Sequence, residues 1–334
     1  MHNIKLLKAG NEVDWQFELA NAITCVDELL DALGLEQSEN KFIRNPEFRL
    51  LVPRSFVNKM QKRNADDPLL KQVLPVTSEN SASGLADPVG DLNAMKTPGL
   101  LHKYKGRVLL VTTGACAIHC RYCFRRHFPY SDSNPGRHEW KHAVEYLHSH
   151  DDIREVILSG GDPLVLDNAK LARLCSALEA IPHVECLRIH TRLPVILPSR
   201  IDDALITLLK KLRFRITIVI HANHANELMI DELEALQRLR SSGITLLNQS
   251  VLLKGINDSS ASLINLSLRL HQAGVLPYYL HMLDPVQGAM HFDVPQNRAV
   301  ELLNTLKQEL PGYLVPRLVR EKPGEASKTA IFTI

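Results

Sequence analysis

The chain has 334 residues, of which 45% are hydrophobic and 23% are charged, a composition typical of a globular protein rather than a disordered one. Its 39 Lys and Arg residues nearly balance its 37 Asp and Glu residues, and the net charge of +2 excludes a globally basic nucleic-acid-binding protein. No apolar run approaches the ~18 residues that a transmembrane helix needs, so no membrane partner is expected. Residues 1–12 lack the apolar stretch of a signal peptide, which predicts a cytoplasmic protein.

The first hundred residues are expected to be helices and loops packed on a larger domain. Residues 26–35 have the pattern of a short helix that ends near Gly34. Residues 77–91 are rich in Ser, Asn, Gly and Asp, which favours a loop. Prolines interrupt the chain between these segments, at Pro46, Pro53, Pro68 and Pro75. We therefore treat residues 1–100 as an N-terminal helical extension.

From Arg107 onwards, short apolar runs alternate with segments of helical periodicity. The runs predict strands at residues 108–113, 155–159, 185–190, 215–220, 245–251 and 277–282. The segments between and after them predict helices at residues 138–150, 167–180, 202–211, 225–241, 259–273 and 296–310. Six strands alternating with six helices predict an α/β fold with a parallel sheet. Because the strands are short and no Gly-rich dinucleotide turn is present, we expect a partial (β/α)6 barrel over residues 101–312, followed by a C-terminal segment, 313–334.

Polar residues gather after the predicted strands. In such folds ligands bind at the carboxyl ends of the strands, which lie together at one edge of the sheet. The residues at these positions are Cys116, Gly160, Gly161, Asp162, Thr191, Arg192, His221, His224 and Asp284. We expect them to surround one site.

Three of the six cysteines stand within eight residues, in the spacing Cys116-x3-Cys120-x2-Cys123. An even number of cysteines permits disulfides, but without an export signal a reduced setting with metal ligation is the better interpretation. Zinc is an alternative, with His119 or His127 as a fourth ligand, although structural zinc usually takes two spaced ligand pairs. The other cysteines are expected to be ordinary buried thiols: Cys25, Cys175 and Cys186.

The cysteine motif after the first barrel strand resembles that of the radical S-adenosylmethionine (SAM) superfamily. The resemblance implies that Cys116, Cys120 and Cys123 bind three irons of a [4Fe–4S] cluster and leave the fourth iron open. It also implies that SAM binds this iron and is cleaved to a 5′-deoxyadenosyl radical. Residues 159–162, Ser-Gly-Gly-Asp, resemble the glycine motif that meets the methionyl amino group of SAM.

Longer segments narrow the resemblance to the lysine 2,3-aminomutase family. They are residues 67–75, 87–90, 98–104, 107–126 and 248–255. The resemblance runs from about residue 65 to the C-terminus. This family adds pyridoxal 5′-phosphate (PLP) to the radical SAM machinery. The resemblance thus implies an isomerase that moves the α-amino group of L-lysine from C2 to C3.

The resemblance also assigns residues to PLP, which needs a lysine for its Schiff base and cationic donors for its phosphate. Lys328, in the turn 323–328, resembles the PLP lysine, although this turn has one glycine where the family has several. Arg107 and Tyr104 resemble the residues that hold the phosphate, which suits the forked donors of arginine. Four strand-end residues are expected to line the SAM or PLP pocket: Arg192, His221, His224 and Gln249.

Substrate contacts follow from the same resemblance. Arg125 resembles the residue that clamps the α-carboxylate, whereas the neighbouring Arg126 is expected to be an ordinary surface charge. Asp284 resembles the first of two acids that meet the ε-ammonium of lysine, and Glu321 stands where the second acid would be Asp. Two carboxylates facing one ammonium favour lysine over glutamate as the substrate.

The chain ends six residues after Lys328, which resembles the short branch of the family that acts in the modification of elongation factor P (EF-P). That branch implies (R)-β-lysine as the product. It also implies partners: EF-P, a ligase related to lysyl-tRNA synthetase that attaches β-lysine to EF-P, and a reductant such as flavodoxin or ferredoxin. The alternatives are a general free-lysine or glutamate 2,3-aminomutase and a non-enzymatic Fe–S partner of the EF-P machinery.

Overall fold

The computed structural model describes residues 14–36, 41–131 and 140–332. In them, ten strands form one sheet whose spatial order follows the chain from β1 to β10. The six predicted strands are β3 (Arg107–Thr113), β4 (Glu155–Gly160), β5 (Cys186–Thr191), β6 (Arg215–Ile220), β7 (Thr245–Val251) and β8 (Leu276–His281). Each pairs with the next in parallel, which confirms the predicted parallel sheet.

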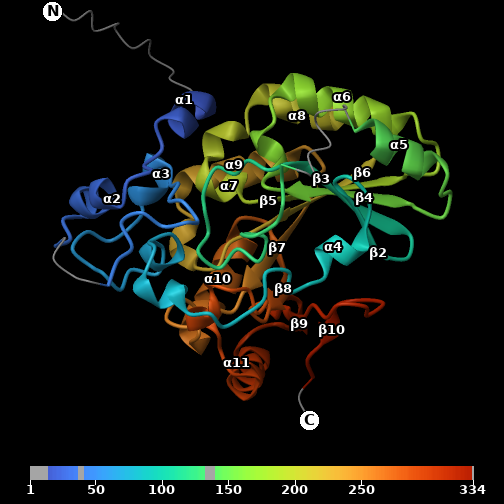
Figure 1. The fold of residues 1–334 in the computed structure, drawn as a ribbon. Helices are drawn as coiled ribbons and strands as arrows, with labels where there is room; N and C mark the ends of the chain where they lie inside the picture. The colour runs from blue at the N-terminus through green and yellow to red at the C-terminus, as the bar shows by residue number, and fades with distance from the viewer. Residues whose placement is uncertain (1–13, 37–40, 132–139, 333–334) are drawn as a thin grey trace, which may run out of the picture.

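Helices follow the strands as expected, and Figure 1 shows several of them along the outer face of the curved sheet. They are α5 (Lys141–His148), α6 (Asn168–Glu179), α7 (Leu193–Ile196), α8 (Asp203–Lys211), α9 (Ile230–Ser241), α10 (Ser260–Gln272) and α11 (Gln296–Glu309). Residues 138–139 of the first predicted helix lie outside the described residues.

The helix predicted for residues 225–241 is wrong at its start. The chain instead forms a 3-10 turn, η6 (Ala225–Glu227), and then α9. The Glu227 carboxylate accepts from the backbone N–H of Asn223 at 2.8 Å and of His224 at 2.9 Å, which closes the first turn. The Glu232 carboxylate accepts from the N–H of Met229 at 2.9 Å and caps a new helix.

Four short strands were not predicted, and they extend the sheet at both edges. β1 (Met95–Thr97) and β2 (Leu100–Tyr104) form antiparallel pairs that lead into β3. At the other edge, β9 (Arg317–Arg320) runs parallel to β8 and pairs with β10 (Thr329–Ala330). These strands are too short to show an alternating pattern. Among the described strands, β1 and β10 are the two edges of the sheet and do not pair with each other. The barrel is therefore open, as predicted.

The N-terminal extension contains short helices: α1 (Trp15–Ala20), α2 (Val26–Leu33), α3 (Arg54–Val57), η1 (Leu70–Gln72), η2 (Thr77–Asn80) and α4 (Asp91–Ala94). The helix expected at 26–35 is confirmed as α2, which ends at Gly34 in a left-handed conformation (φ 64°). Apart from η2, residues 77–90 form turns and loops, as expected. Further 3-10 turns are η4 (Pro163–Val165), η5 (Pro198–Arg200), η7 (Met290–Phe292) and η8 (Gly312–Leu314).

The extension shares its hydrophobic core with the barrel. Leu29, Phe56 and Leu70 of the extension are fully buried in the same cluster as Leu158 and Leu187 of the barrel strands. A second cluster packs α11 against β8 and β9 near the C-terminus. The division of the chain at residues 100 and 312 stays a prediction.

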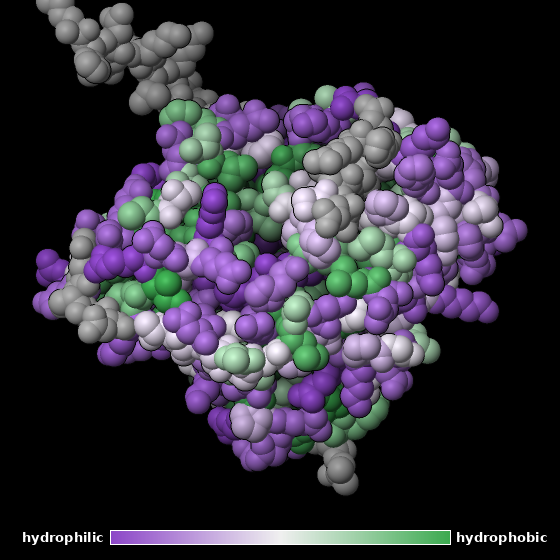
Figure 2. All heavy atoms as spheres, in the orientation of Figure 1, coloured by the Kyte–Doolittle hydropathy of each residue, from purple (hydrophilic) through white to green (hydrophobic). Residues whose placement is uncertain are grey.

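Polar side chains cover most of the face seen in Figure 2, and apolar residues gather there in small separate groups. In the described ranges, every helix is too short or too polar to cross a membrane.

Candidate active site

One cavity of about 580 Å³ lies inside the barrel. Fourteen of the residues that the sequence predicts for the site line it: Tyr104, Arg107, Cys116, Cys120, Cys123, Arg125, Gly160, Gly161, Asp162, His221, Gln249, Asp284, Glu321 and Lys328. Arg192 lines it as well, whereas His224 does not. The His224 imidazole instead accepts from the N–H of Asn226 and caps η6.

The lining runs along the strands rather than staying at their carboxyl ends. Cys116 follows the end of β3, but Arg107 is the first residue of the same strand. Seven residues of extended chain span roughly 20 Å. The cavity therefore has a thiol end and an arginine end.

The cysteine loop at the thiol end is held by the N-terminal extension. The backbone N–H of His119 donates to Leu51 O at 2.9 Å, and that of Arg121 donates to Gln72 O at 2.8 Å. The buried carboxylate of Glu79 accepts from the Arg121 guanidinium (Nε, 2.8 Å). These bonds fix the backbone between the cysteines.

Arg126 is also tied to Glu79, and the expectation of a surface charge at Arg126 is wrong. Its guanidinium is buried and donates to Glu79 Oε2 at 2.8 Å and to Gly288 O at 2.9 Å. The buried Arg126 guanidinium therefore connects the cysteine loop to Glu79 of the extension and to Gly288 of the barrel.

The three thiols of the loop interact electrostatically. Burial, followed by the charge of Cys123, raises the pKa of Cys116 well above its usual value, and burial raises the pKa of Cys123 to about 11. All three cysteines are free and half-buried, and a positively charged metal centre would stabilise their thiolates.

A single-metal site does not fit. In the described part of the chain, no three His, Cys, Asp or Glu side chains are close enough to share one ion. A [4Fe–4S] cluster differs, because each thiolate binds a different iron and the sulfurs stand farther apart. The histidines proposed for zinc are also engaged elsewhere: His119 Nδ1 lies 2.8 Å from Arg49 O, and His127 Nε2 lies 3.2 Å from Gln287 O.

The glycine turn after β4 lies against the segment that precedes Cys116. The N–H of Gly161 donates to Thr113 O at 2.7 Å, and the N–H of Asp162 donates to Ala115 O at 2.8 Å. A Cβ atom on Gly161 would lie only 2.0 Å from Ala115 O, so this approach requires glycine. The Asp162 carboxylate is bonded within the protein, to Thr191 Oγ1 at 2.7 Å and the Arg192 N–H at 2.6 Å.

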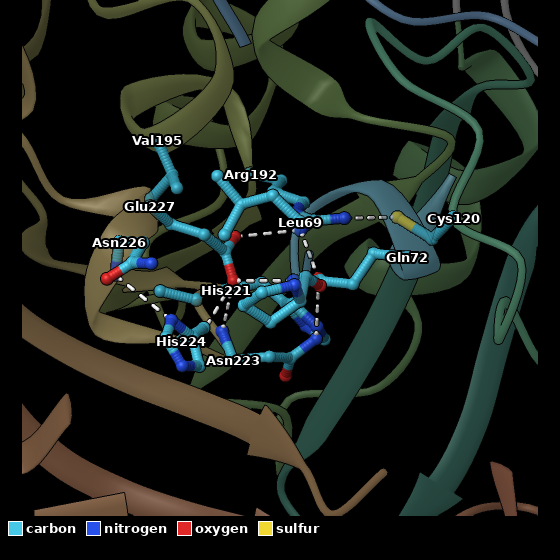
Figure 3. Close-up of polar contacts among 12 residues, drawn as sticks. Leu69, Gln72, Cys120, Arg192, Val195, His221, Asn223, His224, Asn226 and Glu227 are labelled. Carbon is cyan, nitrogen blue, oxygen red and sulfur yellow. Dashed lines mark hydrogen bonds and ion pairs between the residues drawn. The ribbon is translucent and has the colours of Figure 1, made fainter. Parts of the chain in front are cut away.

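A buried polar network lies beside Cys120 (Figure 3). Arg192 Nη1 donates to Cys120 Sγ at 2.7 Å, and the same guanidinium pairs with Glu227. The Tyr122 hydroxyl connects this network to His221 Nε2 at 3.1 Å. Burial and the charge of Arg192 lower the pKa of His221 to about 3, so this imidazole is neutral.

Lys328 lies in an alternating chain of charges at the C-terminal side of the cavity. Its Nζ donates to Glu321 Oε2 at 2.5 Å, and Glu321 Oε1 accepts from Lys103 Nζ at 2.8 Å. Lys103 also contacts Asp91 at 2.6 Å, and Asp91 pairs with Arg125 Nε at 2.6 Å. Burial opposes ionisation of Glu321, but the charges of Lys328 and Lys103 prevail and lower its pKa to about 2.

Asp284 lines the cavity beside Glu321, and among the described residues its carboxylate forms no ion pair. Its Oδ1 is buried and has no hydrogen-bond partner among the described residues. Burial and the nearby charge of Glu321 raise its pKa to about 7. The carboxylate of Asp284 is therefore suited to bind a cationic group of a ligand.

The arginine end suits an anion. The Arg107 guanidinium lies 4.7 Å from the ring of Tyr104, and within the described ranges neither Arg107 nor Arg317 pairs with a carboxylate. Arginines lining a cavity without a counter-ion are suited to a phosphate.

Comparison with known proteins explains this combination of residues. Residues 110–266 match the Radical SAM superfamily. The chain is 46% identical to the L-lysine 2,3-aminomutase of Escherichia coli (strain K12), over 99% of this chain and 98% of that protein. The chain belongs to the lysine 2,3-aminomutase family of radical SAM enzymes. The L-lysine 2,3-aminomutase of Haemophilus influenzae is 48% identical over 95% of both chains.

The family also contains longer proteins. The L-lysine 2,3-aminomutase of Clostridium subterminale is 34% identical over 95% of this chain but only 77% of that protein. The higher identity to the shorter relatives confirms the predicted resemblance to the short branch. Among solved structures, a radical SAM methyltransferase from Sphaerobacter thermophilus aligns over 66% of this chain and 68% of that chain, with 15% identity and a TM-score of 0.46.

Radical SAM enzymes use a [4Fe–4S] cluster and SAM, so membership of the lysine 2,3-aminomutase family implies both for this chain. The expectation that the other three cysteines are buried is confirmed for Cys175, whereas Cys186 is half-buried and Cys25, at the N-cap position of α2, is exposed. The sequence analysis gave no role to several other lining or supporting residues, although Gln72 and Lys103 lie in segments that resemble the family: Gln72, Glu79, Asp91, Lys103, Glu227 and Arg317.

Proposed function

We propose that this chain converts L-lysine to (R)-β-lysine by 2,3-amino migration and that the product serves the modification of EF-P in the cytoplasm. The observation that supports the proposal most is a single cavity lined by three thiols, a lysine amine and a carboxylate that lacks a cation. The names of the relatives support the reaction, and the resemblance to the short branch supports the link to EF-P.

In the proposed reaction, Cys116, Cys120 and Cys123 hold the cluster and leave one iron for SAM. Gly160 and Gly161 are proposed to meet the amino group of SAM, because their lack of side chains lets this turn pack directly against the backbone that leads to Cys116. The remaining SAM contacts are proposed for His221, Gln249 and Asp162, which line the cavity nearby.

PLP is proposed to bind between Lys328 and the arginine end. Lys328 supplies the amine that attaches it, and Arg107 and Tyr104 hold its phosphate. When bound, the cluster with SAM supplies a hydrogen-abstracting radical, and PLP supplies the conjugated ring that permits nitrogen migration. The chain's own residues position the groups and exclude water.

The substrate is proposed to bind by its two ends. The Arg125 guanidinium donates to Asp91 through Nε and to Ser159 through Nη1, and these two bonds hold it in place. Its remaining N–H groups bind the α-carboxylate. Asp284 and Glu321 bind the ε-ammonium. Glu321 already has two lysine partners, so Asp284 contributes more of the new attraction.

Anaerobic reconstitution with iron, sulfide and PLP, followed by incubation with L-lysine, SAM and dithionite, tests the reaction. Chiral chromatography should detect (R)-β-lysine, and L-glutamate should give no β-amino acid. A protein with intact cluster and PLP that makes no β-lysine would refute the lysine assignment. EF-P incubated with its ligase and the product should gain the mass of one lysyl group, and an unchanged mass would remove the EF-P link alone.

Two sets of variants test the cofactor residues without relying on turnover. Cys116→Ser, Cys120→Ser and Cys123→Ser should each lose the cluster absorbance, whereas Cys25→Ser, at an exposed position, should retain it. Lys328→Ala should lose borohydride-trapped PLP in peptide mapping, and the exposed neighbour Lys322→Ala should keep it. PLP trapped on another lysine would refute the assignment of Lys328.

A further inference from the structure

Arg192 directs a buried positive charge at one of the three clustered cysteines. It follows β5 at the carboxyl end of the sheet and is almost fully buried. Its Nη1 donates to Cys120 Sγ at 2.7 Å (Figure 3). A guanidinium is always charged, so this contact is a charge-assisted hydrogen bond to sulfur.

Two residues from distant parts of the chain hold this guanidinium in place. Its Nη2 donates to Glu227 Oε2 at 2.8 Å and to Gln72 Oε1 at 2.6 Å. Glu227 and Gln72 are fully buried, and the Gln72 amide donates to Glu227 Oε1 at 3.1 Å. Because each group is bonded on several sides, moving Arg192 away from Cys120 would leave a buried charge without its partner.

The network also explains why Gln72 belongs to the site. Gln72 Oε1 further accepts from Asn223 Nδ2 at 3.1 Å and from the Tyr122 hydroxyl at 3.2 Å. Gln72 comes from η1 of the N-terminal extension, whereas its partners come from the barrel. The extension thus contributes to the position of Arg192 as well as to the cysteine loop.

A fixed positive charge next to a cluster ligand has a predictable electrical effect. Reduction adds one negative charge to the cluster, and a nearby cation in a buried site stabilises that added charge. Hydrogen bonds to cluster sulfurs likewise raise the reduction potential of an Fe–S centre.

We propose that Arg192, held by Glu227 and Gln72, is a positioning residue that fixes Cys120 and makes the cluster easier to reduce. This inference rests on the proposed function, in which Cys120 is a cluster ligand. It concerns the electron-accepting step before SAM is cleaved, in which a low-potential reductant donates one electron to the cluster. SAM is therefore omitted from the test.

The test is a potentiometric titration of the reconstituted protein, with dithionite as the reductant and the electron paramagnetic resonance signal of the reduced cluster as the readout. Arg192→Met removes the positive charge. Arg192→Lys keeps a positive charge but lacks the forked guanidinium that bonds to Cys120, Glu227 and Gln72 at once. Arg200→Met is the matched control, because Arg200 is also fully buried but bonds to the carbonyls of Leu164 and Leu166, away from the cavity.

At the wild-type midpoint, Arg192→Met should change the reduced-to-oxidised ratio about tenfold toward the oxidised form, which corresponds to about 59 mV for a one-electron couple. Arg192→Lys should lie between this variant and the wild type, and Arg200→Met should match the wild type. If Arg192→Met takes up no cluster, Arg192→Gln, which also removes the charge, decides: a lower midpoint supports the proposal, and an unchanged one overturns it.

Failure of the proposed function and failure of this inference would give different results. A wild-type protein without a [4Fe–4S] spectrum would overturn the proposed function and this inference together. A loaded wild type that shares its midpoint with Arg192→Met would overturn the role of Arg192 alone.

Discussion

Lysine binding should strengthen with pH in a way that depends on Asp284. Burial and the charge of Glu321 raise the pKa of Asp284 to about 7. A carboxyl group with this pKa is roughly 10% ionised at pH 6 and roughly 90% ionised at pH 8, whereas the ε-ammonium of lysine stays charged over this range. If the ionised carboxylate binds the ammonium, Asp284 alone should tighten the dissociation constant for lysine by up to about ninefold between these pH values.

The variant Asp284→Asn should remove this contribution. A charge-assisted hydrogen bond contributes about 2 kcal/mol, so lysine should bind roughly 30-fold more weakly to the variant at pH 8. At pH 6 the difference should shrink to a few-fold, because the wild-type carboxyl is then mostly protonated. Asp203→Asn, with a carboxylate that is almost fully exposed, should follow the wild type at every pH.

Isothermal titration calorimetry of the PLP-loaded protein at pH 6, 7 and 8 measures these constants. Norleucine, which has the same chain without the ε-ammonium, controls for the pH dependence of the α-amino group and of PLP. It should bind wild type and Asp284→Asn alike. Equal pH slopes for lysine in the wild type and in Asp284→Asn would refute this reasoning.

Two further substitutions test the support of the cysteine loop. Glu79→Gln should lower the free energy of unfolding by about 3–5 kcal/mol, because it leaves the buried guanidiniums of Arg121 and Arg126 without a counter-ion. Urea denaturation measures this free energy, and a loss below about 1 kcal/mol would contradict the prediction. Gly161→Ala should keep the cluster absorbance but weaken SAM binding about tenfold or more, because the added Cβ would displace the backbone at Ala115. Equilibrium dialysis measures the SAM affinity. An affinity equal to that of the wild type would show that the turn can shift to accept the Cβ.

The barrel and much of the site were predictable because they depend on local patterns. Short, largely apolar runs define β3 to β8, which are six or seven residues long, and parallel strands bring their carboxyl ends to one edge. Once the strands are known, the loop of Cys116 and the turn of Gly160 must therefore be neighbours. The resemblance added Lys328 and Arg107, which no periodicity points to.

The supporting residues could not be predicted, because their environment is created by contacts between distant segments. Gln72 and Glu79 stand in a region of loops, where polar residues are usually exposed. Their burial is possible only because arginines 42 to 120 positions away supply the hydrogen bonds. The edge strands β9 and β10 pose a similar difficulty, since two to four residues carry no alternating pattern.

The charges of the cavity distinguish the two acids that the resemblance treated as equivalent. Three cations lie next to the other acids of this part of the cavity, and each of them contacts Asp91 or Glu321: Lys103, Arg125 and Lys328. Asp284 is the carboxylate left over, which agrees with its raised pKa and with the unpartnered Oδ1. A bound cation would favour ionisation of Asp284 below pH 7, because it would offset both burial and the charge of Glu321. Selectivity for a ligand with a terminal ammonium should therefore depend more on Asp284 than on Glu321.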